Sequence, residues 1–406
     1  MIVLKAAQEK VLSALQSVAG IVERRHTLPI LANVLIRKRG SSVEFTTSDL
    51  EIQVRTQSEL GGDSGEYATT LAARKLIDIL RSMPNDQTVS LSSNQSKLTL
   101  QGGKSRFTLQ TLPAEDFPLV QEAADFGPSF SVPQKTLKSL INQVHFAMAV
   151  HDIRYYLNGI LFVAEGKMLT LVATDGHRLA LGQATLAGEI PKQEVILPRK
   201  TVLELLRLLK DEEAPIDIRF AGNQAKFEFS GMEFVTKLVE GKFPDYNRVI
   251  PKGHKNHVTL GRIALLSSLQ RAEILTSEKF KGVRLNFEPG LLRITSSNAE
   301  QEEAKEELEI DYQGDPIEIG FNVTYLREAL ANMGQEMVTV SLQDANSSAL
   351  ITIPEQAGFK YVAGTGRLTY AGPNGTFGDA VPRAGNASGG GDCYRCRGKD
   401  EPCGDC

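Results

Sequence analysis

The chain has few of the groups that carry covalent or redox chemistry. Among its 406 residues there are four cysteines, and all of them lie between Cys393 and Cys406. The body of the chain therefore offers no thiol for nucleophilic catalysis. It also lacks a serine in a G-x-S-x-G turn, the strained elbow that many hydrolases use. These absences exclude cysteine catalysis in the body and weigh against a serine hydrolase.

Long apolar runs and a strong positive charge are also missing. No apolar run approaches the roughly 20 residues that a membrane helix needs, and the first residues, MIVLKAAQEK, lack the apolar stretch of a signal peptide. We therefore expect a cytoplasmic protein. The formal net charge of -4 excludes a uniformly basic nucleic-acid binder. It leaves open a set of basic residues gathered on one face.

One sequence pattern occurs three times. Residues 168–183, MLTLVATDGHRLALGQ, alternate apolar and polar residues on both sides of Asp175-Gly176. This predicts a β-hairpin with a two-residue turn, in which Asp-Gly supplies the positive φ angles. Two further copies lie at residues 43–55 and 291–304, with Asp49 and Asn298 at the position of Asp175. We interpret the chain as one structural unit used three times.

Each unit contains two stretches with apolar residues at helical spacing. The predicted helices span residues 6–23, 70–83, 132–150, 198–210, 261–279 and 322–333. Two of them, at residues 73–83 and 198–210, align at about the same repeat distance as the hairpins. Alternating strands surround the helices, which predicts an α+β fold with mostly antiparallel sheets. The predicted domains are residues 1–125, 126–252 and 253–362, followed by a tail at residues 363–406.

The tail differs in composition from the rest of the chain. After Val362, glycine, alanine, asparagine and aspartate dominate and apolar periodicity is lost, which predicts disorder. Two C-x-x-C pairs, a pattern typical of zinc sites, occur here at Cys393, Cys396, Cys403 and Cys406. The spacer between the pairs is short and the surrounding residues offer no core. An unstructured or foreign tail is the favoured interpretation, and a zinc site is the alternative.

Three other motifs invite a chemical interpretation. GGKS at residues 102–105 resembles the end of a P-loop, but Leu98 stands where that motif needs glycine, so a hairpin turn is favoured. Asp175 and His177 could belong to a catalytic triad of an enzyme of nucleic-acid metabolism, although no nucleophile accompanies them. The acidic run at residues 299–309 lacks calcium-loop spacing, so we expect a solvated face.

Basic residues concentrate on the predicted helices, whereas acidic residues crowd the strands and loops. The basic residues concerned are Arg74, Lys75, Arg81, Lys135, Lys138, Arg199, Lys200, Arg207, Lys210, Arg262 and Arg271. On one helix this bias would mean only a solvated face. Shared by four helices, it predicts a positive surface that suits phosphate contact without reading of bases.

Six segments together resemble the bacterial sliding clamp family, the β subunit of DNA polymerase III, over residues 1–362. They are LPILANVL (28–35), SRFTLQTLPAEDFP (105–118), RYYLNG (154–159), ATDGHRLA (173–180), GKFPDYNRVIPK (241–252) and EKFKGVRL (278–285). The resemblance implies a non-catalytic protein without a cofactor that tethers the replicative polymerase to DNA. It also implies a head-to-tail homodimer of three-domain chains, closed into a ring around duplex DNA, with helices lining the hole, in the cytoplasm at the nucleoid.

The resemblance further implies a pocket that binds short motifs of the polymerase catalytic subunit, the clamp loader and other replication and repair proteins. Its residues would be Arg154, Tyr156, Leu157, Thr174, Gly176, His177, Arg178, Leu179, Pro244, Arg248, Val249, Tyr325, Ser348 and Val362. DNA contact would fall to Arg25, Arg74, His151, Tyr155, Arg199 and Lys200. The ring joint would pair Phe107 with Ile274 and Leu275.

One segment departs from the family pattern. Relatives end shortly after Tyr-Val with an apolar Val-Met-Pro-Met-Arg-Leu-like segment that forms part of the pocket wall, whereas this chain reads AGTGRL at residues 363–368. Each buried methionine that is lost removes about 1.5–3 kcal/mol of apolar burial. We therefore expect a pocket with less apolar contact area than in relatives, and an unaffected ring.

Overall fold

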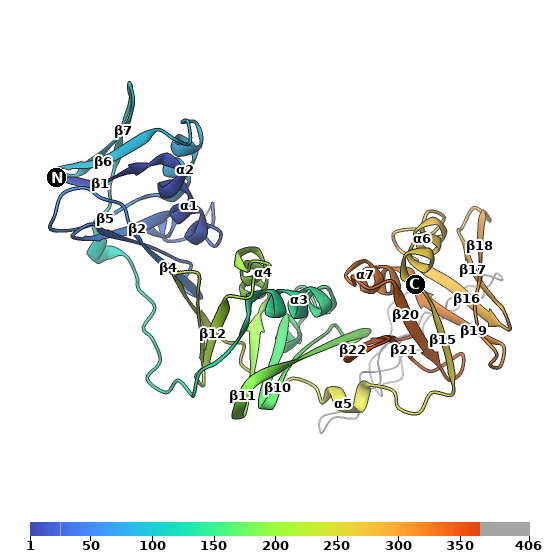
Figure 1. Cartoon of the computed structure of the whole chain (residues 1–406). Coiled ribbons are helices and arrows are strands. Elements are labelled where there is room, and N and C mark those ends of the chain that lie inside the picture. Colours follow the sequence, from blue (N-terminus) through green and yellow to red (C-terminus); the bar gives the residue numbers. More distant parts are fainter. Residues whose placement is uncertain (25, 366–406) are drawn as a thin grey trace, which may run out of the picture.

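The chain folds into three similar α+β domains arranged as an arc (Figure 1). The structure, a computed structural model, describes residues 1–24 and 26–365. Each domain holds two main helices and antiparallel β-sheet, part of which is shared with a neighbouring domain. The predicted α+β fold class is confirmed. Within the described residues, no helix is long and apolar enough to cross a membrane.

Domain 1 runs from β1 to the short helix η2. Its elements are β1 (Ile2–Ala7), α1 (Gln8–Ala19), η1 (Pro29–Ala32), β2 (Asn33–Arg39), β3 (Ser42–Ser48), β4 (Ile52–Glu59), β5 (Glu66–Ala72), α2 (Ala73–Arg81), β6 (Thr88–Asn94), β7 (Lys97–Gly102), β8 (Ser105–Gln110) and η2 (Ala114–Asp116). Gly102 pairs with Ser105 across a two-residue turn, and Gly103 in it has φ +58°. GGKS is therefore a hairpin turn, as predicted.

Domain 2 contains two unusually long strands. Its elements are β9 (Phe130–Pro133), α3 (Gln134–Val144), η3 (His145–Ala147), η4 (Tyr155–Leu157), β10 (Gly159–Thr174), β11 (Arg178–Pro198), α4 (Arg199–Leu208), β12 (Pro215–Phe220), β13 (Gln224–Phe229) and β14 (Met232–Lys237). The predicted helix at 132–150 is shorter than expected. The α-helix ends at Val144, the 3-10 turn η3 continues to Ala147, and Met148 has an extended backbone; Ala147 and Met148 are both buried.

Domain 3 follows a short helix in the linker. The elements are α5 (Tyr246–Val249), β15 (Asn256–Gly261), α6 (Arg262–Glu273), β16 (Gly282–Glu288), β17 (Leu291–Ser297), β18 (Glu303–Glu309), β19 (Ile317–Asn322), α7 (Val323–Ala331), β20 (Met337–Leu342), β21 (Ala349–Ile353) and β22 (Gln356–Ala363). The acidic run contains β18, whose alternate residues are exposed, so the expected solvated face is one side of an edge strand.

The helices form because each presents one apolar stripe to the sheets beneath it. In α1, Val11, Leu15 and Val18 recur at helical spacing and are all buried. The main helices lie along the concave side of the arc, and the sheets lie outside them (Figure 1). Proline precedes α3 and α4, where its fixed φ and missing N–H suit the start of a helix. This arrangement directs the exposed helix faces toward the inside of the arc.

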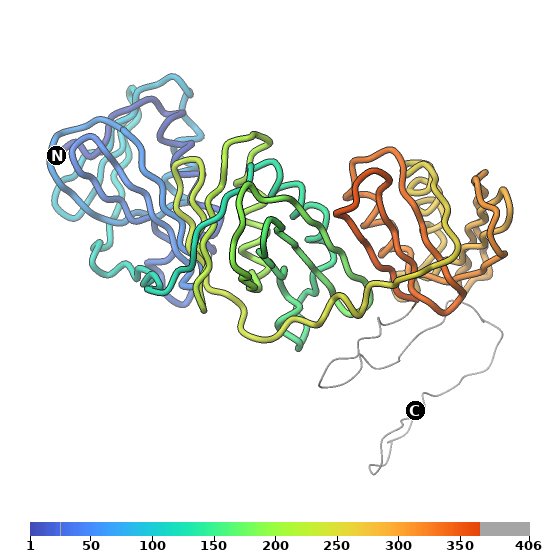
Figure 2. The backbone as a smooth tube through the Cα atoms, turned by 60° about the horizontal axis from the view of Figure 1, so that its bottom comes forward, coloured from blue at the N-terminus to red at the C-terminus, as the bar shows by residue number. Residues whose placement is uncertain are grey.

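Two of the four sheets cross a domain boundary. An eight-stranded sheet, β5-β2-β3-β4-β14-β13-β12-β9, joins domain 1 to domain 2 through β4 and β14. A six-stranded sheet, β10-β11-β22-β21-β20-β15, joins domain 2 to domain 3 through β11 and β22. Figure 2 shows the yellow linker between β14 and β15 crossing from the second to the third domain. The domains are thus held by continuous backbone ladders as well as by side chains.

Two further sheets end in free edges. In the sheet β1-β6-β7-β8, strand β8 has one partner, and in the sheet β18-β17-β16-β19, strand β18 has one partner. These sheets lie at the two ends of the arc, in domains 1 and 3 (Figure 1). An exposed strand edge carries unpaired N–H and C=O groups that can pair with another chain.

The predicted domain limits stay predictions. The limit at residue 125 falls between β8 and β9, and that at 252 falls between α5 and β15. The start of the tail is corrected: Ala363 is the last residue of β22 and is buried, and Thr365 is still described. A main-chain bond from Gly364 N to His177 O, 3.1 Å long, extends the ordered chain past Val362. Residues 366–406, with the four cysteines, lie outside the described residues.

Candidate functional site at the junction of domains 2 and 3

The turn between β10 and β11 is held by its own polar groups. Asp175 Oδ1 accepts from the N–H groups of His177 and Arg178, at 2.9 and 3.1 Å. Thr174 Oγ1 donates to Arg178 O at 2.6 Å and accepts from Gly176 N at 3.2 Å. Asp175 therefore organises the turn by accepting hydrogen bonds from its N–H groups, and its carboxylate is already engaged in these bonds.

The turn differs from the predicted two-residue form. The last paired residues are Thr174 and Leu179, so four residues lie between them. Gly176 alone has a positive φ, +90°. A two-residue Asp-Gly turn would need a positive φ at Asp175 as well. The side-chain bonds of Asp175 and Thr174 stabilise the wider loop, and periodicity in the sequence does not report them.

Arg178 ties this turn to domain 3. Its Nε donates to Asp175 Oδ2 at 3.1 Å, and its Nη1 forms an ion pair with Glu328 on α7. The guanidinium also lies over the rings of Tyr325 and Phe146, with its Cζ 4.8 and 5.7 Å from the ring centres. Arg178 is buried, and an unpaired charge there would be costly. These contacts fix domain 3 against the turn.

The charges around Arg178 decide its protonation. Burial alone would lower the pKa of Arg178, but the carboxylates of Asp175 and Glu328 outweigh burial, so its pKa is higher than usual. Burial raises the pKa of Tyr361, which stays a neutral phenol. The Tyr361 hydroxyl donates to Tyr325 O at 2.6 Å. The cluster is therefore one buried cation with carboxylate partners, which suits a structural joint rather than proton transfer.

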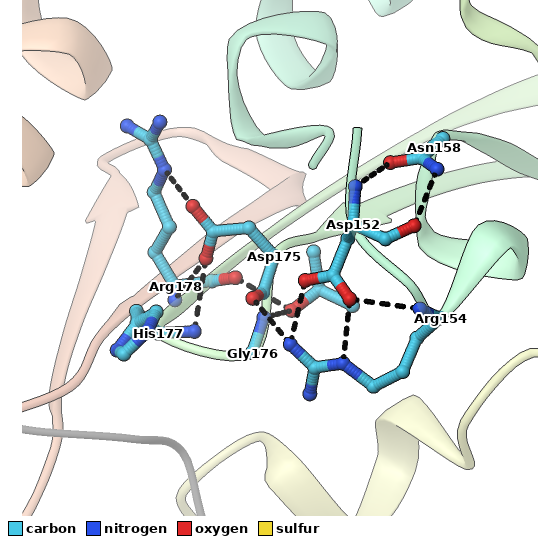
Figure 3. Close-up of polar contacts among 8 residues, drawn as sticks. Asp152, Arg154, Asn158, Asp175, Gly176, His177 and Arg178 are labelled. Carbon is cyan, nitrogen blue, oxygen red and sulfur yellow. Dashed lines mark hydrogen bonds and ion pairs between the residues drawn. The ribbon is translucent and has the colours of Figure 1, made fainter. Parts of the chain in front are cut away.

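A second polar loop stands opposite the turn (Figure 3). Arg154 donates from its backbone N and its Nε to Asp152 Oδ1, at 2.9 and 3.0 Å. Its Nη2 donates to Asp152 Oδ2 at 2.8 Å and to Asp175 O at 3.4 Å. Asn158 and Asp152 exchange two further bonds of 3.0 Å each. The hydrogen bond that Arg154 donates to the Asp152 carboxylate raises the pKa of Arg154. The cation is thereby held beside Gly176.

An apolar cluster lies beneath these two loops. Leu157, Leu179 and Val362 are almost wholly buried in it, and Val249 and Tyr156 pack against it half-exposed. Phe243 and Ile250 also belong to it, and neither is among the residues predicted for the pocket. Phe243 lies within the FPDY motif, which could have signalled it. The cluster offers apolar contacts below the loop of Arg154, with the aromatic ring of Tyr156 at its edge.

The structure brings the predicted pocket residues together at this junction. His177 stacks on Tyr325, with ring centres 6.0 Å apart and planes at 26°. Arg248 lies on α5 with an ion pair to Asp245 of 3.3 Å, Pro244 is buried beside it, and Ser348 O contacts His254 Nε2 at 2.8 Å. Asp152, Phe146 and Glu328 were not predicted. Phe146 and Glu328 come from other segments, whereas Asp152 lies two residues before the predicted Arg154.

The predicted DNA-contact residues lie outside this cluster. Tyr155 and His151 are exposed, and Arg74 lies exposed on α2 with its Nη2 donating to Val22 O at 2.8 Å. Arg199 begins α4. Lys200 is already engaged: its Nζ lies 2.8 Å from Glu23 Oε1 and also bonds Asp49. Arg25 lies outside the described residues.

The expected positive helix surface is only partly present. Several basic residues on the helices pair with carboxylates, which reduces their net field. These are Lys135, Lys138, Lys200, Arg207 and Arg271. Among the described residues, the other basic residues of this set form no ion pair with a carboxylate: Arg74, Lys75, Arg81, Arg199, Lys210 and Arg262. The sequence could not show this because most of the carboxylates come from neighbouring elements.

The predicted ring-joint residues lie at opposite ends of the chain. Phe107 is half-buried in β8 of domain 1. Ile274, 75% exposed, follows α6 in domain 3. Leu275 beside it is half-buried. One chain therefore does not bring these residues together.

Comparison with known proteins decides the family. Models of the N-terminal, central and C-terminal domains of the DNA polymerase III beta subunit match residues 2–121, 131–245 and 247–366. The chain belongs to the β sliding clamp family. The family is the non-catalytic processivity subunit of DNA polymerase III in DNA replication, so the alternative of an enzyme using Asp175 and His177 is wrong. The occupied carboxylate of Asp175 agrees with this.

Relatives cover nearly the whole body of the chain. The beta sliding clamp of Pseudomonas aeruginosa is 44% identical over 369 residues, which are 89% of this chain and 98% of the relative. That of Escherichia coli is 40% identical over 361 residues, 89% of this chain and 98% of the relative. A crystal structure of the P. aeruginosa DNA polymerase III subunit beta superposes with a TM-score of 0.87 at 42% identity, covering 91% of this chain and all of that one.

We predict that Gly176→Ala destabilises the clamp more than Gly166→Ala does. Both glycines have positive φ, +90° and +59°, so each alanine costs about 1–2 kcal/mol of backbone strain. An added Cβ at Gly176 would also lie 3.1 Å from Arg154 Nη1, whereas Gly166 has no neighbour within 4 Å. Urea unfolding of both variants measures the difference. Equal losses would show that Arg154 yields without cost.

We predict a loss of stability on mild acidification that depends on His145. Burial lowers the pKa of His145 below its ordinary value of 6.5. Protonation therefore favours the unfolded chain, and stability falls as pH drops through 6.5 toward the lower folded value. Urea unfolding at about pH 7.5 and 5.5 should show a smaller decrease for His145→Gln than for the parent chain. His257→Gln is the control, and an equal decrease in all three would contradict the prediction.

Proposed function

We propose that two copies of this chain close head-to-tail into a ring around duplex DNA and tether the replicative polymerase to it, in the cytoplasm. One observation carries the proposal. In domain 1, the strand that follows the repeated turn is β4, and it pairs with β14, the last strand of domain 2. In domain 2, the corresponding strand is β11, and it pairs with β22, the last strand of domain 3. The third such strand, β18, and the last strand of domain 1, β8, have free edges. A second copy supplies both missing partners.

Side chains at the two free edges support this pairing. Ile274 and Phe280 are 75% and 65% exposed next to the domain 3 sheet, and Phe107 lies in β8. Large exposed apolar side chains of this kind mark an interaction surface. Head-to-tail pairing of two copies would bury them twice, once at each joint of the ring.

The charges of the two edges are also complementary. The β18 edge carries Glu303 and Glu309, neither of which has a cationic partner among the described residues. The β7–β8 hairpin carries Lys97, Lys104 and Arg106. Opposite charges steer the two edges toward each other and disfavour pairing of like edges. The ring would therefore close head-to-tail rather than head-to-head.

Duplex DNA would pass along the concave side, where the helices lie (Figure 1). Arg74, Arg199, His151 and Tyr155 would contact it there, with Arg25 from outside the described residues. Lys200 would contribute its charge while it stays bound to Asp49 and Glu23. Enclosure retains DNA topologically, so phosphate contacts need not be strong and the net charge can stay negative. Weak contacts leave the ring able to slide.

The junction of domains 2 and 3 would hold short motifs of the polymerase catalytic subunit, the clamp loader and other clamp-binding proteins. Leu157, Leu179, Pro244 and Val249 would receive aliphatic or aromatic anchors. Polar groups at the rim, Arg154 and His177 among them, would orient the bound peptide. By the family resemblance, the segment that begins at Ala363 and Gly364 replaces larger apolar residues, so part of the apolar wall would be missing here. Partner affinity would be lower for that reason.

The proposal predicts topological retention. With the clamp loader and ATP, the chain should stay on circular plasmid through gel filtration at raised salt and be lost after the plasmid is cut. The reason is that enclosure, unlike phosphate binding, does not weaken with salt. Equal and salt-sensitive retention on circular and linear DNA would contradict a ring.

We predict that Ile274→Ala combined with Leu275→Ala yields monomers. Each side chain contributes about 1.5–3 kcal/mol if buried at the joint. Ile153→Ala is the matched control, because Ile153 is 95% exposed in domain 2. Sedimentation equilibrium measures the mass of all three proteins. A dimer of unchanged affinity for the double variant would place the joint elsewhere.

We predict that His177→Ala weakens polymerase stimulation without changing the dimer mass. His177 stacks on Tyr325 at the rim of the junction and lies far from the free strand edges. His257→Ala, on β15, is the control. Primer-extension length and sedimentation together give the answer. A parallel loss of both properties would indicate a structural role for His177.

A further inference from the structure

A second groove opens between domains 1 and 2. It has a volume of about 630 Å³ and lies between one face of α1, the end of β4, the β13–β14 turn and the end of α4 with the two residues after it. Its floor includes the buried side chains of Leu208, Leu209 and Met232. Serine hydroxyls of α1 line one wall. The groove thus combines an apolar floor with hydrogen-bonding walls, as peptide and ligand sites do.

Three cations border this groove. Lys10 Nζ donates to Glu59 O at 2.7 Å, and Arg207 Nη2 pairs with Glu204 Oε1 at 2.6 Å. Lys210 is exposed, and its ammonium has no carboxylate partner among the described residues. Glu9 is the one acidic residue that lines the groove. Because Glu204 already pairs with Arg207, the remaining positive charge of the border comes from Lys10 and Lys210, against the one carboxylate of Glu9.

The repeated design provides an internal comparison. The helices α3 and α7 stand at the junction of domains 2 and 3 where α1 and α4 stand at the junction of domains 1 and 2. Counting from the first residue of each helix gives the positions that correspond to Lys10, Arg207 and Lys210. Those positions hold Thr136, Ala331 and Gly334. The fold at this place does not require cations. The positive border belongs to the junction of domains 1 and 2.

The groove faces away from the pocket described above. That pocket lies at the turn end of the β11–β22 ladder, where Arg178 pairs with Ala363. In the β4–β14 ladder, the equivalent turn end is at Asp49, and the groove lies at the other end, where Thr56 pairs with Met232. Because equivalent turns point the same way in a repeated fold, the two sites open on opposite faces of the arc.

We propose that this groove binds an acidic peptide segment of a partner protein, with apolar side chains on the Leu208–Leu209–Met232 floor and carboxylates against Lys10, Arg207 and Lys210. The apolar floor favours a peptide over DNA phosphates, which need only the cations. A partner held here occupies the face opposite the polymerase pocket, so both can be bound together. Only the statement that both partners can bind together rests on the proposed function, because it assumes a ring with two faces.

The test uses a short fluorescein-labelled peptide of alternating leucine and glutamate, with fluorescence anisotropy on the full-length chain. We expect saturable binding that weakens about tenfold or more in the double variant Lys10→Glu with Lys210→Glu, because both carboxylate partners are repelled. Lys192→Glu, an exposed lysine elsewhere in domain 2, should leave binding unchanged. His177→Ala should also leave it unchanged.

Several outcomes would overturn the inference. These are absence of binding, equal binding of a leucine-lysine peptide, an unaffected double variant, and loss of binding in His177→Ala, which would place the peptide in the other pocket. A short duplex that binds the parent chain and loses affinity in the double variant, while the peptide does not, would make the groove a DNA contact. Sedimentation of the same proteins reports whether they form dimers. It therefore separates a failure of this inference from a failure of the proposed ring.

Discussion

The backbone ladder that continues across each domain boundary is the interaction on which the rest of the structure depends. At β4–β14 and β11–β22 the domains share sheets, so the geometry of strand pairing fixes how each domain follows the previous one. The same pairing leaves β8 and β18 with free edges at the two ends of the arc. An unpaired edge favours association, and two complementary edges on one chain favour a closed, repeated contact.

The candidate site depends on this ladder. The residues predicted for it come mainly from the turn before β11, from the loop around Arg154, from α5, from α7 and from the end of β22. They meet only because β22 pairs with β11 and Arg178 reaches Glu328 on α7. A buried guanidinium between two carboxylates and two aromatic rings is stable only when all partners are present. The site is therefore a product of domain assembly.

The three copies of the turn have taken different partners. Asp49 binds Lys200 of domain 2, whereas Asp175 binds Arg178, which continues to Glu328 of domain 3. In the third copy Asn298 exchanges hydrogen bonds with Glu302 of its own hairpin. The joints between domains 1 and 2 and between domains 2 and 3 therefore use the carboxylates of Asp49 and Asp175. At the free end of domain 3, Asn298 stands at this position and offers no carboxylate. In the proposed ring, the contact between chains at that end would rest on apolar side chains and surface charges, which suits a joint that opens.

The sequence by itself determined the threefold repeat, the α+β class and the positions of the main helices, because each rests on local periodicity. It also predicted most of the residues that meet at the junction of domains 2 and 3, through their resemblance to a known family. It did not show that Asp175 and Thr174 widen the turn, that Lys200 is bound by Asp49, or that β22 extends to Ala363. Only the tertiary structure decided these points, because hydrogen bonds and ion pairs between distant segments depend on which strands pair, and local spacing carries no record of that choice.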